Sequence, residues 1–591
     1  MRRDSIVHLM CAPVLAVVLP CAFITVDGAE DRTLEEFKQY AATRAAAFSE
    51  VQLDALARGV DKDGNGIITD EEFAARMEVF QRIASGVTPP TKNVDMDETV
   101  VRDAAKVRDL TNTGTAMVLL VTADELAAAW ESYAEWKTRQ GKATKIITVQ
   151  QIAKSYEADN IQEQIRLCVR DHIDNHGTRW VVLGGDSLPG GKGLVPGGHL
   201  TVHRQERAGI PTDIVYLSET NWDADGDGVY GEWDDDRAAI SYPDGSVGLG
   251  RVPVRTAQDV SAFTDKVIAY ESRYPETKFA KQMIYTCTDS PAYPKVRNSW
   301  DSYVSEAWDG TVGRFFSQET PWDKEGEPGS YPLSAENLVG LFNGRSTGKM
   351  HIHGHGHLPA WVLERSTFTA DHVGQLENIG AYPLITTVSC NTGEYDSRRD
   401  PSIVELMIRK PKGGSVAIVA PVRTGKMHFA NPADMQLMVS EGKLDGTTLS
   451  MTRYWEHGLG QGVTTGEAMM HSKADMAEDA VKSASYHLCI CELNLLGDPT
   501  LDMRASDPRT PSIKAPTQVT AGKQIVQIAT DAPGCTVCLW KDDEVYSVVQ
   551  TGENGNAELS IEPTTAGDLL ITVSGPSLNT VAATIKVQSG E

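Results

Sequence analysis

The sequence predicts an α/β protein whose mostly parallel sheets are flanked by helices, preceded by a helical segment and followed by a β-sandwich. Three observations support this. From residue 117 to about residue 505, short apolar runs alternate with helical stretches, which is typical of a parallel sheet covered on both faces. Before residue 90, two helical stretches surround a polar loop. After about residue 510, apolar and polar residues alternate between turn signals.

Length and composition limit the class of protein. A chain of 591 residues predicts three to five domains, at about 100–200 residues per domain. With 41% hydrophobic and 23% charged residues, the composition is globular and excludes a disordered or coiled-coil protein. The net charge of −26 argues against nucleic-acid binding, because phosphate contacts need clustered Lys and Arg. An acidic surface suits bound cations without naming a substrate.

The first 29 residues are typical of a secretory signal peptide. Arg2 and Arg3 precede an apolar run from about residue 11 to residue 26, and small residues follow it. The run is too short to span a membrane, and no other stretch reaches about 18 apolar residues, so we expect export without stable membrane insertion. Two of the nine cysteines, Cys11 and Cys21, lie in this segment. The seven others are too few for a disulfide scaffold, and their odd number leaves at least one thiol free or intermolecular.

Residues 30–90 are predicted to form a helical EF-hand segment, with residues 91–116 as a linker. The loop 61–72 has oxygen-bearing side chains at positions 1, 3, 5 and 12 and a glycine at position 6. The expected Ca²⁺ ligands are these side chains and one backbone carbonyl: Asp61, Asp63, Asn65, Ile67 and Glu72. The alternative interpretation is an Asp- and Gly-rich turn between two helices.

The alternating region divides into two α/β blocks, 117–275 and 276–505. In the first we expect strands at 117–121, 145–149 and 180–183 and helices at 125–139, 159–176 and 257–273. In the second we expect strands at 282–287, 349–353, 384–389 and 415–420 and helices at 335–342, 401–409 and 465–480. These blocks form either two subdomains or one large sheet. Residues 510–591 are predicted to form the β-sandwich.

A second acidic loop follows residue 222. It repeats the EF-hand spacing, with expected Ca²⁺ ligands Asp223, Asp225, Asp227, the Val229 carbonyl and Asp234. An Asp stands at position 12 instead of the usual Glu, and helical flanks are not evident. Neighbouring carboxylates repel one another unless a cation lies between them. The sequence therefore predicts a second Ca²⁺ site, with a solvated acidic turn as the alternative.

Candidate reactive side chains follow two expected strands. Residues 350–357 read Met-His-Ile-His-Gly-His-Gly-His, and residues 384–394 end in Ser-Cys390-Asn-Thr-Gly-Glu. In open parallel sheets, functional residues lie beyond the carboxyl ends of strands, so a histidine and a cysteine here can face each other. An imidazole promotes the reactive thiolate. The backbone N–H groups of Gly356 and Cys390 are candidate donors to an oxyanion.

These motifs resemble the gingipain family of cysteine peptidases. The resemblance includes the His-Gly and Ser-Cys-Asn-Thr-Gly-Glu strand ends. It extends to three further segments: 209–216 with its acidic loop, 248–253 and 494–500. It covers roughly residues 117–503 and implies a caspase-like fold. The small domain that follows it would be immunoglobulin-like.

The resemblance also implies residue roles and polypeptide substrates. Cys390 would be the nucleophile, and His355 the general base, chosen among four histidines by its Gly-His-Gly context, with His353 as the next choice. Asp213 would lie in a specificity pocket that favours Arg or Lys before the cut, through a charge-assisted hydrogen bond. The alternative for Asp213 is a turn cap or a contribution to the neighbouring acidic loop.

Two other functions stay open. Four histidines at alternate positions of one strand would face one side, which suits a metal and predicts a metallohydrolase. A catalytically inactive, exported binding protein is the third interpretation. For Cys390 itself, the alternative is a buried core thiol. The sequence leaves the physiological substrate and the oligomeric state open.

Overall fold

The computed structural model describes residues 115–590, except 190–191, 202–208, 276–278, 289–297, 301, 303, 305–307, 317–329, 346, 364–365, 398–400 and 426–443. Before residue 115 it describes the backbone of four short strands. β1 (Ile6–His8) pairs with β2 (Phe23–Thr25), and β3 (Arg32–Thr33) pairs with β4 (Ile67–Ile68), both antiparallel. The side chains of the expected EF-hand ligands, most of the signal peptide and most of the linker lie outside the described residues. The chain forms two compact units, Met1–Met96 and Asp97–Glu591.

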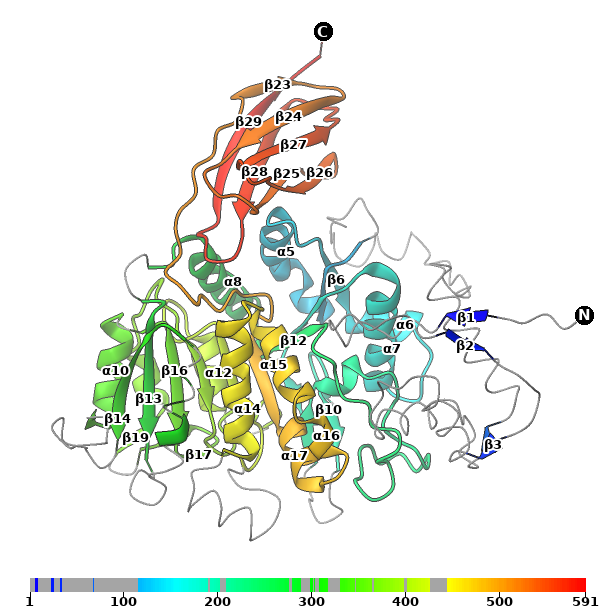
Figure 1. The fold of residues 1–591 in the computed structure, drawn as a ribbon, viewed down its shortest axis with the longest axis vertical. Coiled ribbons are helices and arrows are strands. Elements are labelled where there is room, and N and C mark those ends of the chain that lie inside the picture. The colour runs from blue at the N-terminus through cyan, green and yellow to red at the C-terminus, as the bar shows by residue number, and fades with distance from the viewer. Residues whose placement is uncertain are drawn as a thin grey trace, which may run out of the picture. The chain divides into compact units, whose positions relative to one another are not determined.

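In the second unit, one eleven-stranded sheet joins both predicted α/β blocks (Figure 1). The strand order is β15-β14-β13-β16-β20-β21-β22-β12-β7-β5-β6. Every neighbouring pair is parallel except β21 and β22, which are antiparallel. The sheet therefore has two halves whose strands run in opposite directions, and β22 belongs by direction to the first half.

The first half of the sheet, β6 to β12, comes from residues 118–252. Its strands are β5 (Val118–Thr122), β6 (Thr144–Thr148), β7 (Trp180–Gly184) and β12 (Gly248–Val252). Its helices are α5 (Asp124–Arg139), α6 (Val149–Ser155), α7 (Ile161–His176) and α8 (Ala257–Ser272). Helix ends follow local sequence: Thr148 and Thr256 form capping boxes at α6 and α8, and Gly177 ends α7 with a φ of 70°.

Between β7 and β12 the chain forms two small hairpins. β8 (Ser187–Leu188) pairs with β9 (Lys192–Gly193), and β10 (Gly198–Leu200) pairs with β11 (Ile210–Thr212). A 3₁₀ turn, Ile214–Leu217, and the acidic loop follow.

The second half of the sheet comes from residues 282–421. Its strands are β13 (Gln282–Cys287), β14 (Thr311–Phe316), β15 (Tyr331–Pro332), β16 (Lys349–His353), β20 (Leu384–Thr387) and β21 (Ala417–Pro421). Its helices include α10 (Ala335–Asn343), α11 (Ala370–Gly374) and α12 (Ile403–Arg409). A small three-stranded sheet, β17 (His355–His357), β18 (Ala360–Val362) and β19 (Thr367–Phe368), follows β16.

The segment after β21 returns the chain to the middle of the sheet. It contains α14 (Gly446–Trp455), a π-helical turn (Glu456–Gly460), α15 (Thr465–Ala474), α16 (Ala477–Ala480), α17 (Ala484–Glu492) and β22 (Leu493–Gly497). The sequence predicted one helix over 465–480, but the structure ends α15 at Ala474 and begins a separate short helix at Ala477. Most of the central strands are fully buried, because helices cover both faces of the sheet.

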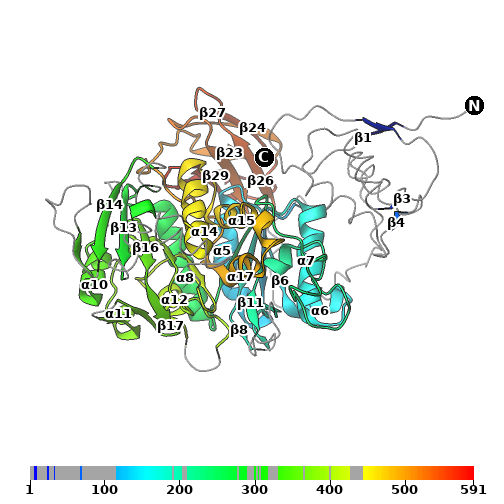
Figure 2. The same cartoon turned by 60° about the horizontal axis from the view of Figure 1, so that its bottom comes forward.

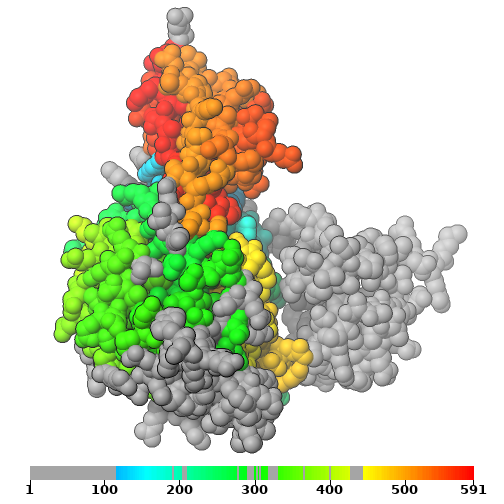
Figure 3. Space-filling view, turned by 60° about the vertical axis from the view of Figure 1, so that its left-hand side comes forward, coloured from blue at the N-terminus to red at the C-terminus, as the bar shows by residue number. Residues whose placement is uncertain are grey.

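The C-terminal residues form the predicted β-sandwich, a separate lobe (Figure 3). Its larger sheet has the order β23-β29-β28-β25-β26, and β24 pairs with β27. The strands are β23 (Gln518–Thr520), β24 (Gln524–Ala529), β25 (Thr536–Lys541), β26 (Val545–Gln550), β27 (Asn556–Ile561), β28 (Gly567–Ser574) and β29 (Val581–Gln588). The lobe contacts α5 through β25 and β28. Among the described residues, no helix is both long and apolar enough to cross a membrane.

Candidate active site

The two predicted reactive segments follow the carboxyl ends of two neighbouring parallel strands, so both begin at the same end of these strands. β16 and β20 are parallel and adjacent, with Lys349 opposite Leu384 and Ile352 opposite Thr387. The Val388 N–H continues the pairing to the Ile352 carbonyl at 3.2 Å. The chain then turns at Gly354 into β17, and after β20 it enters the turn that carries Cys390. The carboxyl ends of parallel neighbours thus meet, as the sequence predicted.

The nucleophile turn, residues 389–393, is held against residues 421–425. The Asn391 N–H donates to the Arg423 carbonyl at 2.7 Å, and the Gly393 N–H donates to the Pro421 carbonyl at 2.9 Å. The Cys390 Sγ lies 3.5 Å from the Gly425 carbonyl oxygen, which accepts its hydrogen bond. Asn391 has a φ of 59°, in the left-handed region that Asn tolerates better than most residues.

Gly356 brings the histidine segment against this turn. A Cβ built on Gly356 would lie 2.8 Å from the Ser389 Cβ and 2.9 Å from the Cys390 carbonyl oxygen, closer than real Cβ contacts allow. The residue after His355 must therefore be glycine for β17 to pack this closely. This contact places the backbone of the predicted base beside that of the predicted nucleophile.

The environment of Cys390 favours the protonated thiol. The residue is half-buried, and burial, followed by the nearby Glu492 carboxylate, raises the pKa of the thiol above its ordinary value. His355 is exposed on β17. A thiol of this kind needs a base to become a nucleophile, which is the role predicted for His355.

The four histidines do not share one face. His351 and His353 are buried in β16, whereas His355 and His357 are exposed in β17, because the strand breaks at Gly354. The His351 ring stacks on Trp300, with centroids 4.3 Å apart, and its Nδ1 lies 2.8 Å from the Thr386 Oγ1. Burial lowers the pKa of His351 well below its ordinary value. The metallohydrolase alternative depends on one face shared by all four histidines, and the buried and exposed pairs do not form such a face. None of the four belongs to the metal-type group found among the described residues.

The structure corrects the expectation for Asp213. Its side chain is buried, and its two oxygens accept hydrogen bonds from the Arg251 Nε and Nη2, both at 2.7 Å. The Arg251 guanidinium also donates to backbone carbonyls and lies 4.7 Å from the centre of the Tyr395 ring. A buried guanidinium needs a counter-charge, and Asp213 supplies it. The carboxylate is therefore not open to a basic side chain of a substrate.

The acidic loop gathers three of its predicted ligands. Asp223, Asp225 and Asp227 each place a carboxylate oxygen within 4.8 Å of the others. The loop is closed by hydrogen bonds such as those from the Gly226 and Gly228 N–H groups to Asp223, at 2.9 and 3.2 Å. Three carboxylates in this arrangement fit a hard cation such as Ca²⁺.

Position 12 of this loop differs from the prediction. Asp234 is exposed and does not belong to the group. Asp236 instead is fully buried and accepts hydrogen bonds from the backbone N–H groups of Ala224, at 2.6 Å, and Glu232, at 3.1 Å. The loop is therefore braced two residues later than the EF-hand spacing predicts. The run of carboxylates at 234–236 was the only sequence signal for this brace.

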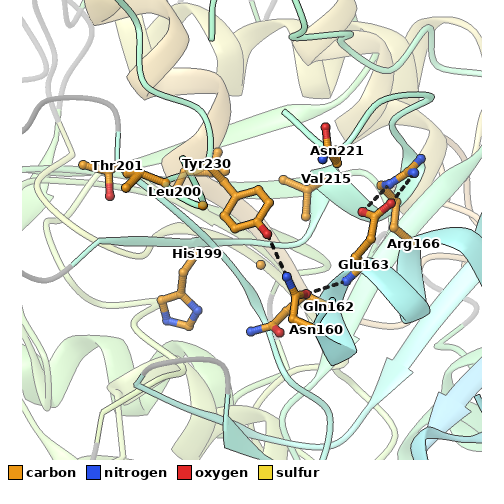
Figure 4. Close-up of a pocket in the computed structure, with 13 residues that line it drawn as sticks. Asn160, Gln162, Glu163, Arg166, His199, Leu200, Thr201, Val215, Asn221 and Tyr230 are labelled. Carbon is orange, nitrogen blue, oxygen red and sulfur yellow. Dashed lines mark hydrogen bonds and ion pairs between the residues drawn. The ribbon is translucent and has the colours of Figure 1, made fainter. Parts of the chain in front are cut away.

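A cavity of about 480 Å³ lies beside this loop (Figure 4). Asn160 at the start of α7 donates to the Tyr230 hydroxyl at 2.7 Å, and Arg166 pairs with Glu163 at 2.6 Å. None of the residues that line the cavity belongs to the nucleophile turn or to β17. His199 lines the cavity and also contacts Asp396, six residues after Cys390, so it links the cavity to the segment that follows the nucleophile turn.

Together, a histidine segment and a cysteine turn at adjoining strand ends of a caspase-like sheet define a fold of the cysteine-peptidase type. The profile of peptidase family C25 matches residues 111–504, and the chain belongs to this family. The resemblance to gingipains inferred from the motifs is thereby confirmed.

Named relatives agree with this assignment. Gingipain R2 of Porphyromonas gingivalis strain ATCC 33277 is 23% identical over 480 residues, which cover 80% of this chain and 57% of the relative. Gingipain R1 of Porphyromonas gingivalis is 24% identical over 476 residues, 79% of this chain and 42% of that protein. The chain thus spans about half the length of these curated relatives. The crystal structure of the Arg-specific cysteine proteinase gingipain R superposes with a TM-score of 0.59 at 19% identity, covering 81% of this chain and 99% of that structure, and so confirms the fold.

Proposed function

We propose that this protein is an exported cysteine endopeptidase in which Cys390 attacks the scissile carbonyl and His355 transfers the proton. The observation that carries the proposal is the contact of Gly356 with the nucleophile turn, because it brings the backbone next to His355 against the backbone of Cys390. The family assignment supports the same chemistry. Polypeptides are the substrate class.

The chemistry follows from the state of the thiol. Because its pKa is raised, Cys390 rests protonated and needs a base when substrate binds. His355 accepts the thiol proton as Sγ bonds to the carbonyl carbon, and then gives that proton to the leaving amine. The N–H groups of Gly356 and Cys390 are the proposed donors to the oxyanion. Water then hydrolyses the acyl-enzyme with His355 again as base, which regenerates the thiol.

Preference for Arg or Lys before the cut is part of the proposal. It rests on the related structure named as an Arg-specific proteinase, and Asp213 does not carry it, since Arg251 occupies both of its oxygens. A panel of fluorogenic peptides that differ only at this residue measures the preference. Equal cleavage of basic and apolar members would reject it.

The test of the mechanism is peptide cleavage by matched variants. Cys390→Ala and His355→Ala should each abolish cleavage while the folded structure, followed by circular dichroism, persists. His357→Ala is the control, because His357 is exposed on the same short strand two residues further on. Iodoacetamide should inactivate the wild type. Cleavage that survives in Cys390→Ala, or that His357→Ala abolishes as fully as His355→Ala, contradicts the assignment.

We also propose that the acidic loop binds Ca²⁺ through Asp223, Asp225 and Asp227 with the Val229 carbonyl, and that residues 61–72 form an EF-hand site. The support is the clustering of the three carboxylates and, for residues 61–72, the spacing of the ligands. Calcium titration with calorimetry tests both loops. For export, the support is the basic and apolar pattern before residue 30. The N-terminal residue of protein recovered outside the producing cells tests it.

A further inference from the structure

A charged cluster outside the reacting residues ties the nucleophile turn to its surroundings. Its centre is Asp396, whose side chain is only 2% exposed. The Arg423 Nη1 donates to the Asp396 Oδ1 at 2.9 Å and the Nη2 to Oδ2 at 2.8 Å, while the His199 Nε2 lies 3.1 Å from Oδ2. Burial alone would raise the pKa of Asp396, but these partners outweigh it and lower the pKa to about 2. The carboxylate is thus a fixed negative charge at neutral pH.

Arg423 connects this charge to the nucleophile in two ways. Its backbone carbonyl accepts the N–H of Asn391, the residue directly after Cys390. Its side chain reaches across to Asp396, on the same segment as the nucleophile. Gly425, two residues further along, accepts the hydrogen bond of the Cys390 thiol. Residues 390–396 and 421–425 are therefore joined by two main-chain hydrogen bonds, the hydrogen bond of the Cys390 thiol and one bidentate ion pair.

The cluster also reaches the first half of the molecule. The Arg423 Nε donates to the Gly209 carbonyl at 3.0 Å, just before β11, and His199 lies in β10. Both contacts hold the β10–β11 hairpin beside the nucleophile turn. In Figures 1 and 2 this hairpin and β17 lie toward the same side of the molecule, at the bottom of each view. Among the described residues, Glu394 also faces the cluster: its carboxylate lies 3.9 Å from Arg423 and accepts a hydrogen bond from the Asn391 side chain.

We infer that Asp396 and Arg423 form a clamp that fixes the position of the Cys390 thiol, and that His199 extends it to the β10–β11 hairpin. Asp396 is a positioning residue: its partners are Arg423 and His199 rather than the thiol, and it holds the segment that carries the thiol. This inference rests on the proposed role of Cys390. The sequence gives no hint of it, because the partners of Asp396 lie 27 and 197 residues away.

The clamp predicts a specific change in the thiol. In Asp396→Asn the ion pair loses its charge, and the nucleophile turn gains freedom. The thiol then becomes more exposed, and since burial is the main cause of its raised pKa, that pKa falls toward the ordinary value. A misplaced nucleophile lowers kcat by about 10- to 100-fold. KM should stay near the wild-type value, because the Asp396 side chain is buried. A purely structural role would lower stability without moving the thiol pKa.

The experiment measures the rate of Cys390 alkylation by iodoacetamide as a function of pH, together with kcat and KM. Cys390 is the one half-buried thiol among the described cysteines and the six others are buried, so native alkylation reports on it; peptide mass analysis confirms the site. Arg423→Lys keeps the charge but loses the bidentate geometry, and it should show the same shift in smaller measure. The double variant should add little to Asp396→Asn, because the two residues act as one unit.

Asp186→Asn is the matched control. Asp186 is also nearly buried, and it pairs with Arg255 at 2.8 Å in the segment after β7, with no contact to the nucleophile turn. The Asp186→Asn variant should leave kcat unchanged, and it should leave unchanged the pH midpoint of the Cys390 alkylation rate. The clamp is wrong if Asp396→Asn keeps the wild-type midpoint and kcat, or if Asp186→Asn moves them equally. Alkylation needs no turnover, so the clamp can be judged even where Cys390→Ala still cleaves peptide and the proposed function fails.

Discussion

The two halves of the central sheet use their strand ends differently. In the first half, the carboxyl ends of the strands serve the fold: Thr122 donates to the Gly184 carbonyl at 2.6 Å, and Thr148 caps α6. In the second half, the ends of β16 and β20 lead to a half-exposed thiol and an exposed imidazole. The strands of the two halves run in opposite directions, so the carboxyl ends of one half lie beside the amino ends of the other. Strand direction, rather than membership of the sheet, decides at which end of the strands the proposed reactive side chains lie.

The first half of the sheet also contacts the region around Cys390. These contacts come from the β10–β11 hairpin rather than from the ends of its strands. His199 of β10 contacts Asp396, and Gly209, just before β11, contacts Arg423, close to the end of β21. The first half therefore acts as a support for the second. Substitutions in each half test whether the first half affects stability and the second half affects cleavage.

The largest difference between the halves is expected from their cysteines. Cys390→Ala should reduce kcat/KM by at least about 10⁴-fold, as removal of a covalent nucleophile does, with little change in the melting temperature. Cys168→Ala, in α7 of the first half, should do the reverse, because Cys168 is fully buried and its loss leaves a small cavity. Kinetics with a fluorogenic peptide and thermal unfolding measure both. Similar effects of the two substitutions on activity would remove the distinction.

The next largest effect is expected from the buried ion pair of the first half. Asp213→Asn leaves the Arg251 charge buried without its counter-charge, which costs about 3–5 kcal/mol of unfolding free energy. The preference for the residue before the cut should not change, because Asp213 faces Arg251 rather than substrate. Urea unfolding and the peptide panel measure the two consequences.

A double substitution makes this test sharper. Asp213→Leu with Arg251→Met removes both charges and should recover most of the lost stability. A changed preference for basic residues in Asp213→Asn, at unchanged stability, would restore the pocket role that the family resemblance implies.

Much of the fold could be predicted from local sequence. The strands at 282–287 and 349–353 were predicted with their observed bounds, because apolar runs and flanking polar residues define them locally. The antiparallel pairing of β21 and β22, which separates the two halves, was not predicted, since pairing direction depends on contacts between distant segments. The same limit explains Asp213. Its partner Arg251 lies 38 residues away, and burial of the pair has no sequence signature.

The site was predictable as far as main-chain position determines it. Cys390 and His355 follow strands that the apolar pattern identifies, and Gly356 marks the close approach. The two-residue displacement of the brace from Asp234 to Asp236 was not visible, because consecutive carboxylates look alike in sequence. Asp396 likewise was not distinguishable from any polar residue after the motif.

A smaller effect on the unfolding free energy is expected when acid protonates Asp396, which contacts residues of both halves. Because the folded pKa of Asp396 is about 2, below its ordinary 3.8, its contribution to stability is present above pH 4 and is lost as pH falls from about 4 to about 2. The contribution is about 2 kcal/mol. Asp396→Asn should therefore be less stable than the wild type at pH 5 and approach it near pH 2. Urea unfolding at several pH values measures the difference, and a gap that stays constant with pH would contradict the ionised pair.

The smallest effect is expected from Ca²⁺ at the acidic loop, which belongs to the first half and should change stability rather than chemistry. At ten times its dissociation constant, the ion would add about 1.4 kcal/mol to the unfolding free energy. Asp225→Asn should weaken this response, because Asp225 is one of the three clustered carboxylates. Asp234→Asn should not, because Asp234 is exposed outside the group. Thermal unfolding with and without Ca²⁺, on protein lacking the 61–72 loop ligands, isolates this loop.

If Asp234→Asn weakens the response as much as Asp225→Asn, the loop closes on the ion as an EF-hand does, with position 12 as a ligand. If chelation lowers kcat at constant stability, the acidic loop of the first half affects catalysis as well as stability.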